Sequence, residues 1–247
     1  MNAAIAIARA RLLGSWRIVR WLIIGALAPV VLLLQIAILA VVALPLPAAT
    51  VATGGGALTL LDRNGEVIVS VSAGAPDRDH WVSLSEIPAV AVSAVIESED
   101  HGFWEHRGVD ARGLMRAAWL DVRGGTMRFG GSTLTMQLAR ILRGTTSERT
   151  VTNKLTESVL ALRIERSLSK RRILEQWLNR AYFGHGAYGI GAAARLYFGK
   201  PVGALSTGEV VLLTILPRAP SAYDPLRRLD AATARRDRVL DLLVRRG

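Results

Sequence analysis

The segment AVAVSAVIESEDHGFWEHRG, residues Ala89–Gly108, joins an apolar helix to a cluster of acidic and aromatic residues. The apolar pattern predicts a helix over Pro88–Glu99. Residues two positions apart do not share a helix face, so Glu97 and Glu99 should point in different directions. One of them can then face inward, among apolar neighbours that raise its pKa. Such a carboxylate could act as a base, although a carboxylate at a helix end is usually just solvated.

Residues after Trp81 show a helical pattern, with apolar side chains recurring every three or four positions. After the first helix, further helices are expected at Leu114–Val122, Thr133–Leu142, Val151–Ser167, Lys170–Leu178, Ala187–Tyr197, Gly208–Leu216 and Leu229–Val244. Eight helices in fewer than 170 residues leave no room for a large sheet. The sequence therefore predicts a mainly helical domain built around one core.

Two short strands are predicted before the helices. The segment LTLLDRNGEVIVSV, Leu58–Val71, alternates apolar residues around Asn64-Gly65, a pair suited to a tight hairpin turn. An isolated hairpin is only marginally stable, so it must pack against another part of the protein. The Gly-rich loop Arg123–Gly131 is expected to be mobile.

The N-terminal part of the chain has the composition of a membrane anchor. Four arginines lie within residues 1–20, and Trp21–Leu44 is a run of 24 uncharged residues. As a helix this run is roughly 36 Å long, enough to cross a hydrocarbon layer of about 30 Å. A cleaved signal peptide is the alternative, but its apolar region normally spans only about 7 to 15 residues. We therefore expect a cytoplasmic basic tail (1–20), a transmembrane helix (21–44), a linker (45–57) and a folded domain (58–247) on the far side of the membrane.

The overall composition excludes several classes of protein. Hydrophobic residues make up 51% of the 247 residues, which excludes a disordered polyelectrolyte despite the net charge of +11. The chain contains no Cys, which excludes disulfides and thiolate zinc sites.

A second segment, GGSTLTMQLAR (Gly130–Arg140), can hold an anion. Two glycines precede Ser132, which we place at the N-cap of a helix whose free N–H groups and dipole favour negative charge. Cations follow at Arg140, Arg143, Arg149 and Lys154, and Glu157 lies one turn after Lys154. Such a strip suits a pyrophosphate, although a solvated or lipid-facing basic surface is the commoner reason for such a run.

Two other kinds of site have little support. The spacing of His101, Glu105 and His106 is not that of a two-histidine zinc protease helix. No Ser-x-x-Lys or Gly-x-Ser-x-Gly frame surrounds Ser132, Thr133 or Thr135, which argues against a nucleophilic acyl enzyme.

Taken together, these segments resemble the peptidoglycan glycosyltransferase family, which comprises monofunctional transglycosylases and the N-terminal domain of class A penicillin-binding proteins. EDHGFWEHRG (99–108) resembles the family's E-D-x-x-F-x-x-H-x-G, and GGSTLTMQ (130–137) resembles G-G-S-T-[IL]-T-Q-Q. KLTE (154–157) resembles K-x-x-E, and KRRILEQWLN (170–179) resembles K-x-x-I-L-E-x-Y-L-N. YFGHGAYGIGAAARLYFGK (182–200) and LPRAPSAYDP (216–225) resemble the remaining blocks, so the likeness covers roughly Leu58 to the end.

This resemblance implies a lysozyme-like helical fold with a membrane-dipping jaw around Leu114–Arg128. It also implies polymerisation of lipid II: the C4 hydroxyl of one disaccharide attacks the anomeric carbon of the growing strand with inversion and expels a polyprenyl pyrophosphate. The implied partners are lipid II, the glycan strand and membrane lipids, with a transpeptidase as a further candidate, but not nucleic acid. The implied location is the bacterial cytoplasmic membrane, crossed once, with the N-terminus cytoplasmic and the catalytic domain periplasmic.

The resemblance also implies roles for individual residues. Glu99 matches the general base, and Glu157 matches a second essential Glu that could organise the donor site, bind metal or orient cations. The substrate- and pyrophosphate-binding positions are Ser132, Thr133, Gln137, Arg140, Arg149 and Lys154. Supporting positions are Asp100, Phe103, His106 and Gly131, with structural roles for Lys170, Glu175 and Asn179. No cofactor is certain, and a divalent cation such as Mg²⁺ is one option.

The sequence departs from the family pattern at four positions: Met136 replaces a second Gln, Arg140 a usual Lys, Asn153 a usual Arg and Trp177 a usual Tyr. No Ser-x-x-Lys frame follows the domain, so we expect a monofunctional enzyme or a piece of a longer protein.

Two other functions remain as alternatives. A lysozyme-like glycan-cleaving enzyme would also use a helix-end Glu, but it needs no pyrophosphate-binding cations. A catalytically weak or inactive membrane-anchored scaffold would not need both Glu99 and Glu157.

Overall fold

The protein is described by a computed structural model that divides into two compact units, residues 1–44 and 45–247. In the second unit, the structure describes the backbone of 58–61 and 67–71, and residues 81–113, 115, 131–144 and 150–246. In the first unit it describes residues 21, 24–25, 27–36, 38–39, 41 and 43. The predicted tail (1–20) and linker (45–57) lie outside the described residues.

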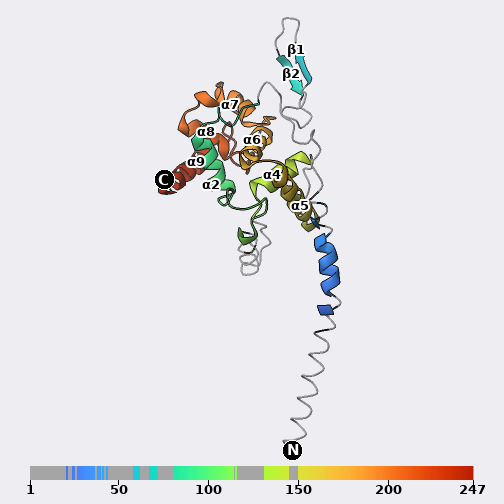
Figure 1. Cartoon of the computed structure of the whole chain (residues 1–247). Coiled ribbons are helices and arrows are strands. Elements are labelled where there is room, and N and C mark those ends of the chain that lie inside the picture. The colour runs from blue at the N-terminus through green and yellow to red at the C-terminus, as the bar shows by residue number, and fades with distance from the viewer. Residues whose placement is uncertain are drawn as a thin grey trace, which may run out of the picture. The chain divides into compact units, whose positions relative to one another are not determined.

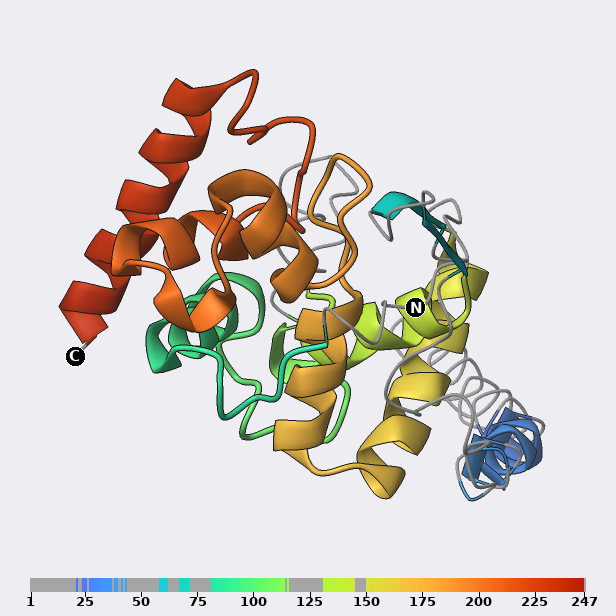
Figure 2. The same cartoon turned by 90° about the horizontal axis from the view of Figure 1, so that it is seen from above.

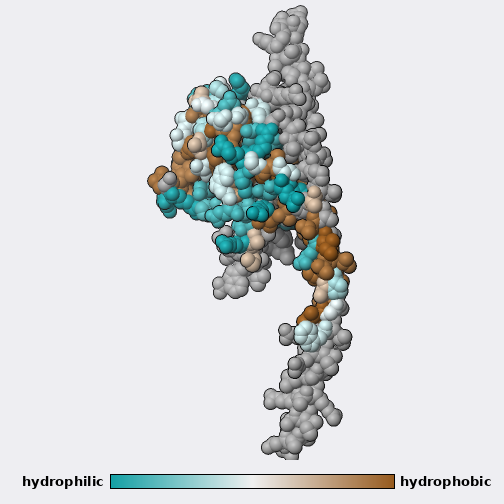
Figure 3. All heavy atoms as spheres, in the orientation of Figure 1, coloured by the Kyte–Doolittle hydropathy of each residue, from teal (hydrophilic) through white to brown (hydrophobic). Residues whose placement is uncertain are grey.

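The described residues of the first unit are helical. Large apolar side chains such as Trp21, Leu33 and Leu39 are more than half exposed, and hydrophobic residues dominate this segment in Figure 3. Among the helices that the structure describes, none is both long and apolar enough to cross a membrane. The assignment of 21–44 as a transmembrane helix stays a prediction.

Two strands pair in antiparallel fashion near the start of the second unit (Figure 1). β1 (Leu58–Leu61) and β2 (Val67–Val71) are in register from Leu58 opposite Val71 to Leu60 opposite Val69, with an irregularity before Leu61. The predicted turn at Asn64-Gly65 lies outside the described residues.

The other described residues of the second unit are mainly helical, as predicted (Figure 1). Its helices are α2 (Ala89–Glu99), α4 (Leu134–Leu142), α5 (Val151–Ser167), α6 (Lys170–Arg180), α7 (Ile190–Phe198), α8 (Thr207–Thr214) and α9 (Leu229–Arg246), with a short 3-10 turn at Val202–Ala204. The helix predicted at Leu114–Val122 and the loop at Arg123–Gly131 lie outside the described residues, except for Met115 and Gly131. The jaw predicted around Leu114–Arg128 therefore stays a prediction.

The core forms around α2, which packs against α8 and α9, while α4 packs against α5 and α6. Figure 2 shows α9 lying alongside α2 and α8. The inner face of α2 is made of small and branched residues, among them Ala91, Ala94 and Val95, all fully buried. Small side chains let neighbouring helices approach closely, and hydrogen bonds of Glu99 and Asp100 then join the end of α2 to α4.

Capping residues explain where several helices begin. Thr150 caps α5 by accepting a hydrogen bond from Asn153 N, and Ser169 caps α6 in the same way. Ser206 and Glu209 form a reciprocal capping box at α8. These side chains satisfy N–H groups that have no partner within their own helix.

The predicted start of one helix at Ala187 is wrong, because α7 begins three residues later at Ile190. Tyr182 and Tyr188 form an isolated bridge before it. Gly189 follows with φ of +89°, and a Cβ there would lie 2.6 Å from the Asn179 carbonyl oxygen. The chain therefore turns sharply against α6 before the helix can start, and glycine permits this turn.

Candidate active site

Glu99 is the inward-facing carboxylate of the pair at the end of α2. Its side chain is only 9% exposed, and its Oε2 accepts a hydrogen bond from Gln137 Nε2 at 3.2 Å. Arg218 Nη1 lies 3.7 Å from the other oxygen. Glu97 instead pairs at the surface with His101 and Arg246. The two carboxylates thus point in different directions, as predicted.

The surroundings of Glu99 raise its pKa above the ordinary value. Burial is the largest cause, because it disfavours the charged form. Three groups act in the opposite direction: Arg218 first, then the hydrogen bond from Gln137, then Arg235. A carboxylate with a raised pKa is a stronger base than an ordinary glutamate, which suits removal of a proton from a hydroxyl group.

Asp100 ties the turn after α2 to the start of α4. Its carboxylate oxygens lie 2.9 and 3.0 Å from His106 Nε2, and Oδ2 also accepts a hydrogen bond from Leu134 N at 2.8 Å. His106 Nδ1 accepts from Gly108 N, so the ring can donate from Nε2 to Asp100. A carboxylate at a helix N-terminus is also favoured by the helix dipole. Asp100 and His106 therefore hold α4 beside Glu99.

The prediction that Ser132 caps this helix is wrong, because Thr133 is the N-cap residue of α4. Thr133 Oγ1 accepts from Met136 N at 3.1 Å and donates to Gly108 O at 2.6 Å. Ser132 is thereby left to accept a hydrogen bond from Lys154 Nζ. Gly131 precedes it with φ of +104°. The Thr133 hydroxyl thus caps the helix, and the neighbouring Ser132 hydroxyl contacts a cation.

A charge-paired cluster lies between α4 and α5. Arg140 donates from Nε and Nη2 to the two oxygens of Glu157, at 2.7 and 2.9 Å. Glu157 is buried, whereas the Arg140 side chain is 34% exposed, and the bond raises the pKa of Arg140. Of the roles that the sequence left open for Glu157, this geometry favours the orientation of cations.

Helix α4 brings the two parts of the site together. Gln137 and Arg140 are three residues apart and therefore share a face, about 4.5 Å apart along the axis. Gln137 contacts Glu99 on α2, and Arg140 contacts Glu157 on α5. Lys154 precedes Glu157 by one turn on α5. Arg149 lies outside the described residues.

Other predicted residues fix the positions of the helices that carry the site. Phe103 is fully buried, and Lys170 Nζ lies 4.5 Å from its ring centroid. Lys170 also pairs with Glu165, whose Oε1 accepts a hydrogen bond from Thr135. These contacts fix the turn after α2 against α4, α5 and α6.

Glu175 and Asn179 fasten the segment that precedes α2. Asn179 accepts from Val82 N and donates to Val82 O, both at 2.8 Å. Glu175 Oε2 accepts from Leu84 N at 3.2 Å. Both residues therefore have structural roles.

Sequence reasoning assigned no role to two arginines that act on Glu99. Arg218 lies in the block LPRAPSAYDP, which the resemblance already marked, and Arg235 lies on α9. The block is a signal that could have found Arg218. Nothing in the local sequence marks Arg235, because its effect depends on how α9 packs on α2. Among the described residues, no group of three or more His, Asp or Glu could hold a metal ion.

The site thus combines a largely buried Glu at a helix end with a paired cation cluster, in a helical domain. The family model of the transglycosylases matches residues 64–244, and the chain belongs to this family. The resemblance to peptidoglycan glycosyltransferases is thereby confirmed.

Several penicillin-binding proteins are curated relatives of this chain. The chain is 44% identical to penicillin-binding protein 1A of Aquifex aeolicus over 167 residues, which is 68% of this chain and 23% of that protein. It is 46% identical to penicillin-binding protein 1A of Escherichia coli over 166 residues, 67% of this chain and 19% of that protein. For penicillin-binding protein 1F of Bacillus subtilis the figures are 39% over 188 residues, 76% and 26%. The chain thus matches only about a fifth to a quarter of the length of these relatives.

Proposed function

We propose that this domain polymerises lipid II into glycan strands by inverting transfer, with release of a polyprenyl pyrophosphate. One observation carries the proposal: α4 places Gln137, bonded to the buried Glu99, one turn from Arg140, bonded to Glu157. A base and a set of cations, brought together by one face of α4, match the two needs of the reaction. One group must take a proton, and others must stabilise the leaving pyrophosphate.

Glu99 is the group that takes the proton. As the C4 hydroxyl of the incoming disaccharide attacks the anomeric carbon, its proton passes to the Glu99 carboxylate. Burial makes this carboxylate more basic, while Gln137 and Arg218 keep the ionised form accessible. A general base tuned toward the working pH is the more effective catalyst.

The cations bind the departing pyrophosphate. Arg140 uses Nε and Nη2 for Glu157, and its partly exposed guanidinium has further N–H groups for phosphate oxygens. Lys154, Ser132 and Arg149 complete the donor side, and Thr133, whose buried hydroxyl caps α4 and donates to Gly108 O, holds Ser132 in place. Charge grows on the pyrophosphate as the bond to the sugar breaks, so prepositioned cations stabilise the transition state more than the ground state.

We further propose that residues 21–44 anchor the domain in the cytoplasmic membrane, with 1–20 in the cytoplasm and 58–247 in the periplasm. The uncharged run and the arginines before it support this topology. Such an anchor suits a substrate whose lipid tail stays in the bilayer. A transpeptidase that crosslinks the product strands is the partner this chemistry calls for.

The direct test is to incubate the purified full chain with labelled lipid II in detergent and resolve the products on a gel. We expect a ladder of polymer that a muramidase removes. If no polymer forms under conditions where a known family member makes it, the proposal is wrong and the scaffold alternative gains. Cleavage of a preformed glycan, without polymerisation, would instead indicate the lysozyme-like alternative.

A further inference from the structure

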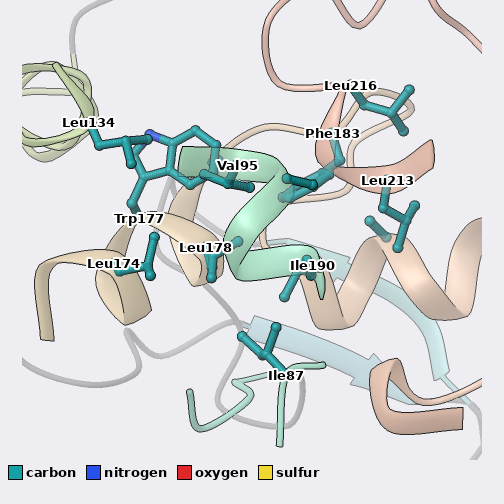
Figure 4. Packing of buried hydrophobic residues seen from close by; sticks show 14 of the residues in the cluster. Ile87, Val95, Leu134, Leu174, Trp177, Leu178, Phe183, Ile190, Leu213 and Leu216 are labelled. Carbon is teal, nitrogen blue, oxygen red and sulfur yellow. The ribbon is translucent and has the colours of Figure 1, made fainter. Parts of the chain in front are cut away.

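Trp177 on α6 is fully buried, yet its indole N–H points at the site. Nε1 donates a hydrogen bond to Gln137 Oε1 at 3.2 Å. Figure 4 shows the ring between Leu134 on α4 and Val95 on α2, with its nitrogen on the side of α4. An indole has one donor and no acceptor, so this contact can be made only with an oxygen.

This bond decides which way round the Gln137 carboxamide lies. With Oε1 facing Trp177, Nε2 must face Glu99, to which it donates at 3.2 Å. The reversed amide would place its NH₂ group against the indole N–H and its oxygen against the Glu99 carboxylate. Both contacts would then be repulsive, so the chemistry of the indole fixes the orientation.

We infer that Trp177 is a positioning residue for the general base, acting through Gln137 to keep a hydrogen-bond donor directed at Glu99. This inference rests on the proposed function, in which Glu99 takes the proton. It also gives a meaning to one departure from the family pattern, because Tyr is usual at this position. A phenol can donate or accept a hydrogen bond, so it is compatible with either orientation of the amide. An indole can only donate, so it is compatible with one orientation.

Few groups share this task with Gln137. The charged groups that act on Glu99 are Arg218, which follows α8, and Arg235 on α9. Arg218 is more than half exposed and lies 3.7 Å away, and its charge lowers the Glu99 pKa more than the Gln137 hydrogen bond, which is the next largest effect in that direction. Gln137 donates the one hydrogen bond from α4 to Glu99 among the described residues. Loss of its orientation should therefore change the protonation of Glu99 measurably.

The test replaces Trp177 in the full chain by Phe and by 3-benzothienylalanine, in which a sulfur atom takes the place of the indole N–H. The second variant keeps the size and shape of the ring, so it folds even if Trp177→Phe does not. In both variants the Gln137 amide is free to turn its oxygen toward Glu99, where it can accept a hydrogen bond from the protonated carboxyl. Because Glu99 must be ionised to act, this stabilisation of the neutral form moves the acid limb of the rate profile to higher pH. We expect a shift of about one pH unit in both variants, with a smaller change on the plateau.

A matched control separates positioning from packing. Phe183→Leu removes an aromatic ring from the same core, away from α4 (Figure 4), and it should lower stability without moving the acid limb. In a Gln137→Met background, the Trp177 variants should move the limb no further, because the group through which they act is gone. An unchanged acid limb in the benzothienylalanine variant would overturn the inference.

A second readout does not depend on the reaction. Carbon-13 NMR of protein labelled at its glutamate carboxyl groups follows the titration of Glu99 directly, with the signal assigned by its loss in Glu99→Gln. The benzothienylalanine variant should raise this pKa, and an unchanged titration contradicts the inference. If the wild-type chain makes no polymer at any pH, the proposed function fails, and this titration still decides whether Trp177 acts on Glu99.

Discussion

The two carboxylates that α4 contacts are held in different ways. Glu99 is bonded by the neutral Gln137, with Arg218 at a longer distance. Glu157 is bonded through both of its oxygens by Arg140, one turn further along the same helix face. Both carboxylates are largely shielded from solvent and both have an arginine partner, but Arg140 lies 2.7 Å from Glu157 whereas Arg218 lies 3.7 Å from Glu99.

This difference matches the chemistry expected of each carboxylate. A base must be able to gain a proton, and burial raises the pKa of Glu99 although Gln137 and the two arginines act in the opposite direction. Glu157 has no proton to take in the proposed reaction, and its ion pair instead fixes the direction of Arg140. The partner of each carboxylate thus decides its role.

The largest effect should come from removing the base. Glu99→Gln keeps the shape of the side chain but cannot accept the hydroxyl proton, so the polymerisation rate should fall by roughly 10³-fold. The measurement is the initial rate with labelled lipid II. Glu97→Gln, two residues away on the same helix and at the surface, is the matched control and should stay active. A fully active Glu99→Gln would show that Glu99 is not the base, and the proposed difference between Glu99 and Glu157 would be wrong.

Removing a cation from the cluster around Glu157 should have the next largest effect. Lys154→Ala deletes the ammonium that donates to Ser132, and the rate should fall by roughly 10²-fold as the pyrophosphate loses a contact. Lys200→Ala, which breaks an exposed pair with Glu209, is the control and should leave the rate unchanged. An unchanged rate in Lys154→Ala would mean that the phosphates bind elsewhere.

Breaking the ion pair should affect stability as well as the rate. Glu157→Gln leaves Arg140 without its charged partner, and we expect a loss of about 1–3 kcal/mol in the free energy of unfolding by urea. The value is below that for a fully buried pair because water screens the partly exposed Arg140. A free energy of unfolding equal to that of wild type would show that the ion pair stabilises the fold no more than an exposed pair does.

Local signals were enough to predict much of the fold. The bounds of α5, Val151–Ser167, agree with the sequence prediction because Thr150 caps its start and Leu168 leaves the helical conformation. Other ends shifted where distant residues decide them. α7 starts late because Gly189 must pass the backbone of α6, and no pattern within residues 182–190 shows that α6 lies there.

The site was predictable as far as residue types and less so as to partners. Spacing alone indicated that Glu97 and Glu99 diverge, but the burial that raises the Glu99 pKa depends on packing. Ser132 and Thr133 are adjacent hydroxyl residues, and either can cap a helix. Thr133 takes that position because its hydroxyl also reaches Gly108 O, a residue 25 positions away. Contacts of this range are not visible in a local motif.

The smallest predicted effect distinguishes the two carboxylates by stability. Because burial raises the folded-state pKa of Glu99, its neutral form stabilises the fold below the unfolded-state pKa, and this contribution is lost as pH rises through the folded-state pKa. At neutral pH the wild-type protein therefore carries an unfavourable buried charge, which the neutral amide of the Glu99→Gln variant lacks. Glu99→Gln should be slightly more stable than wild type at pH 7.

Urea unfolding of both proteins from pH 7 downward checks this sign. The advantage of Glu99→Gln should shrink as the pH falls through the raised pKa, and it should vanish once the wild-type carboxyl is neutral in both states. Glu97→Gln, which removes a surface carboxylate, serves as the reference. If Glu99→Gln is instead less stable at pH 7, with a deficit that grows as pH rises, then Arg218 and Arg235 outweigh burial.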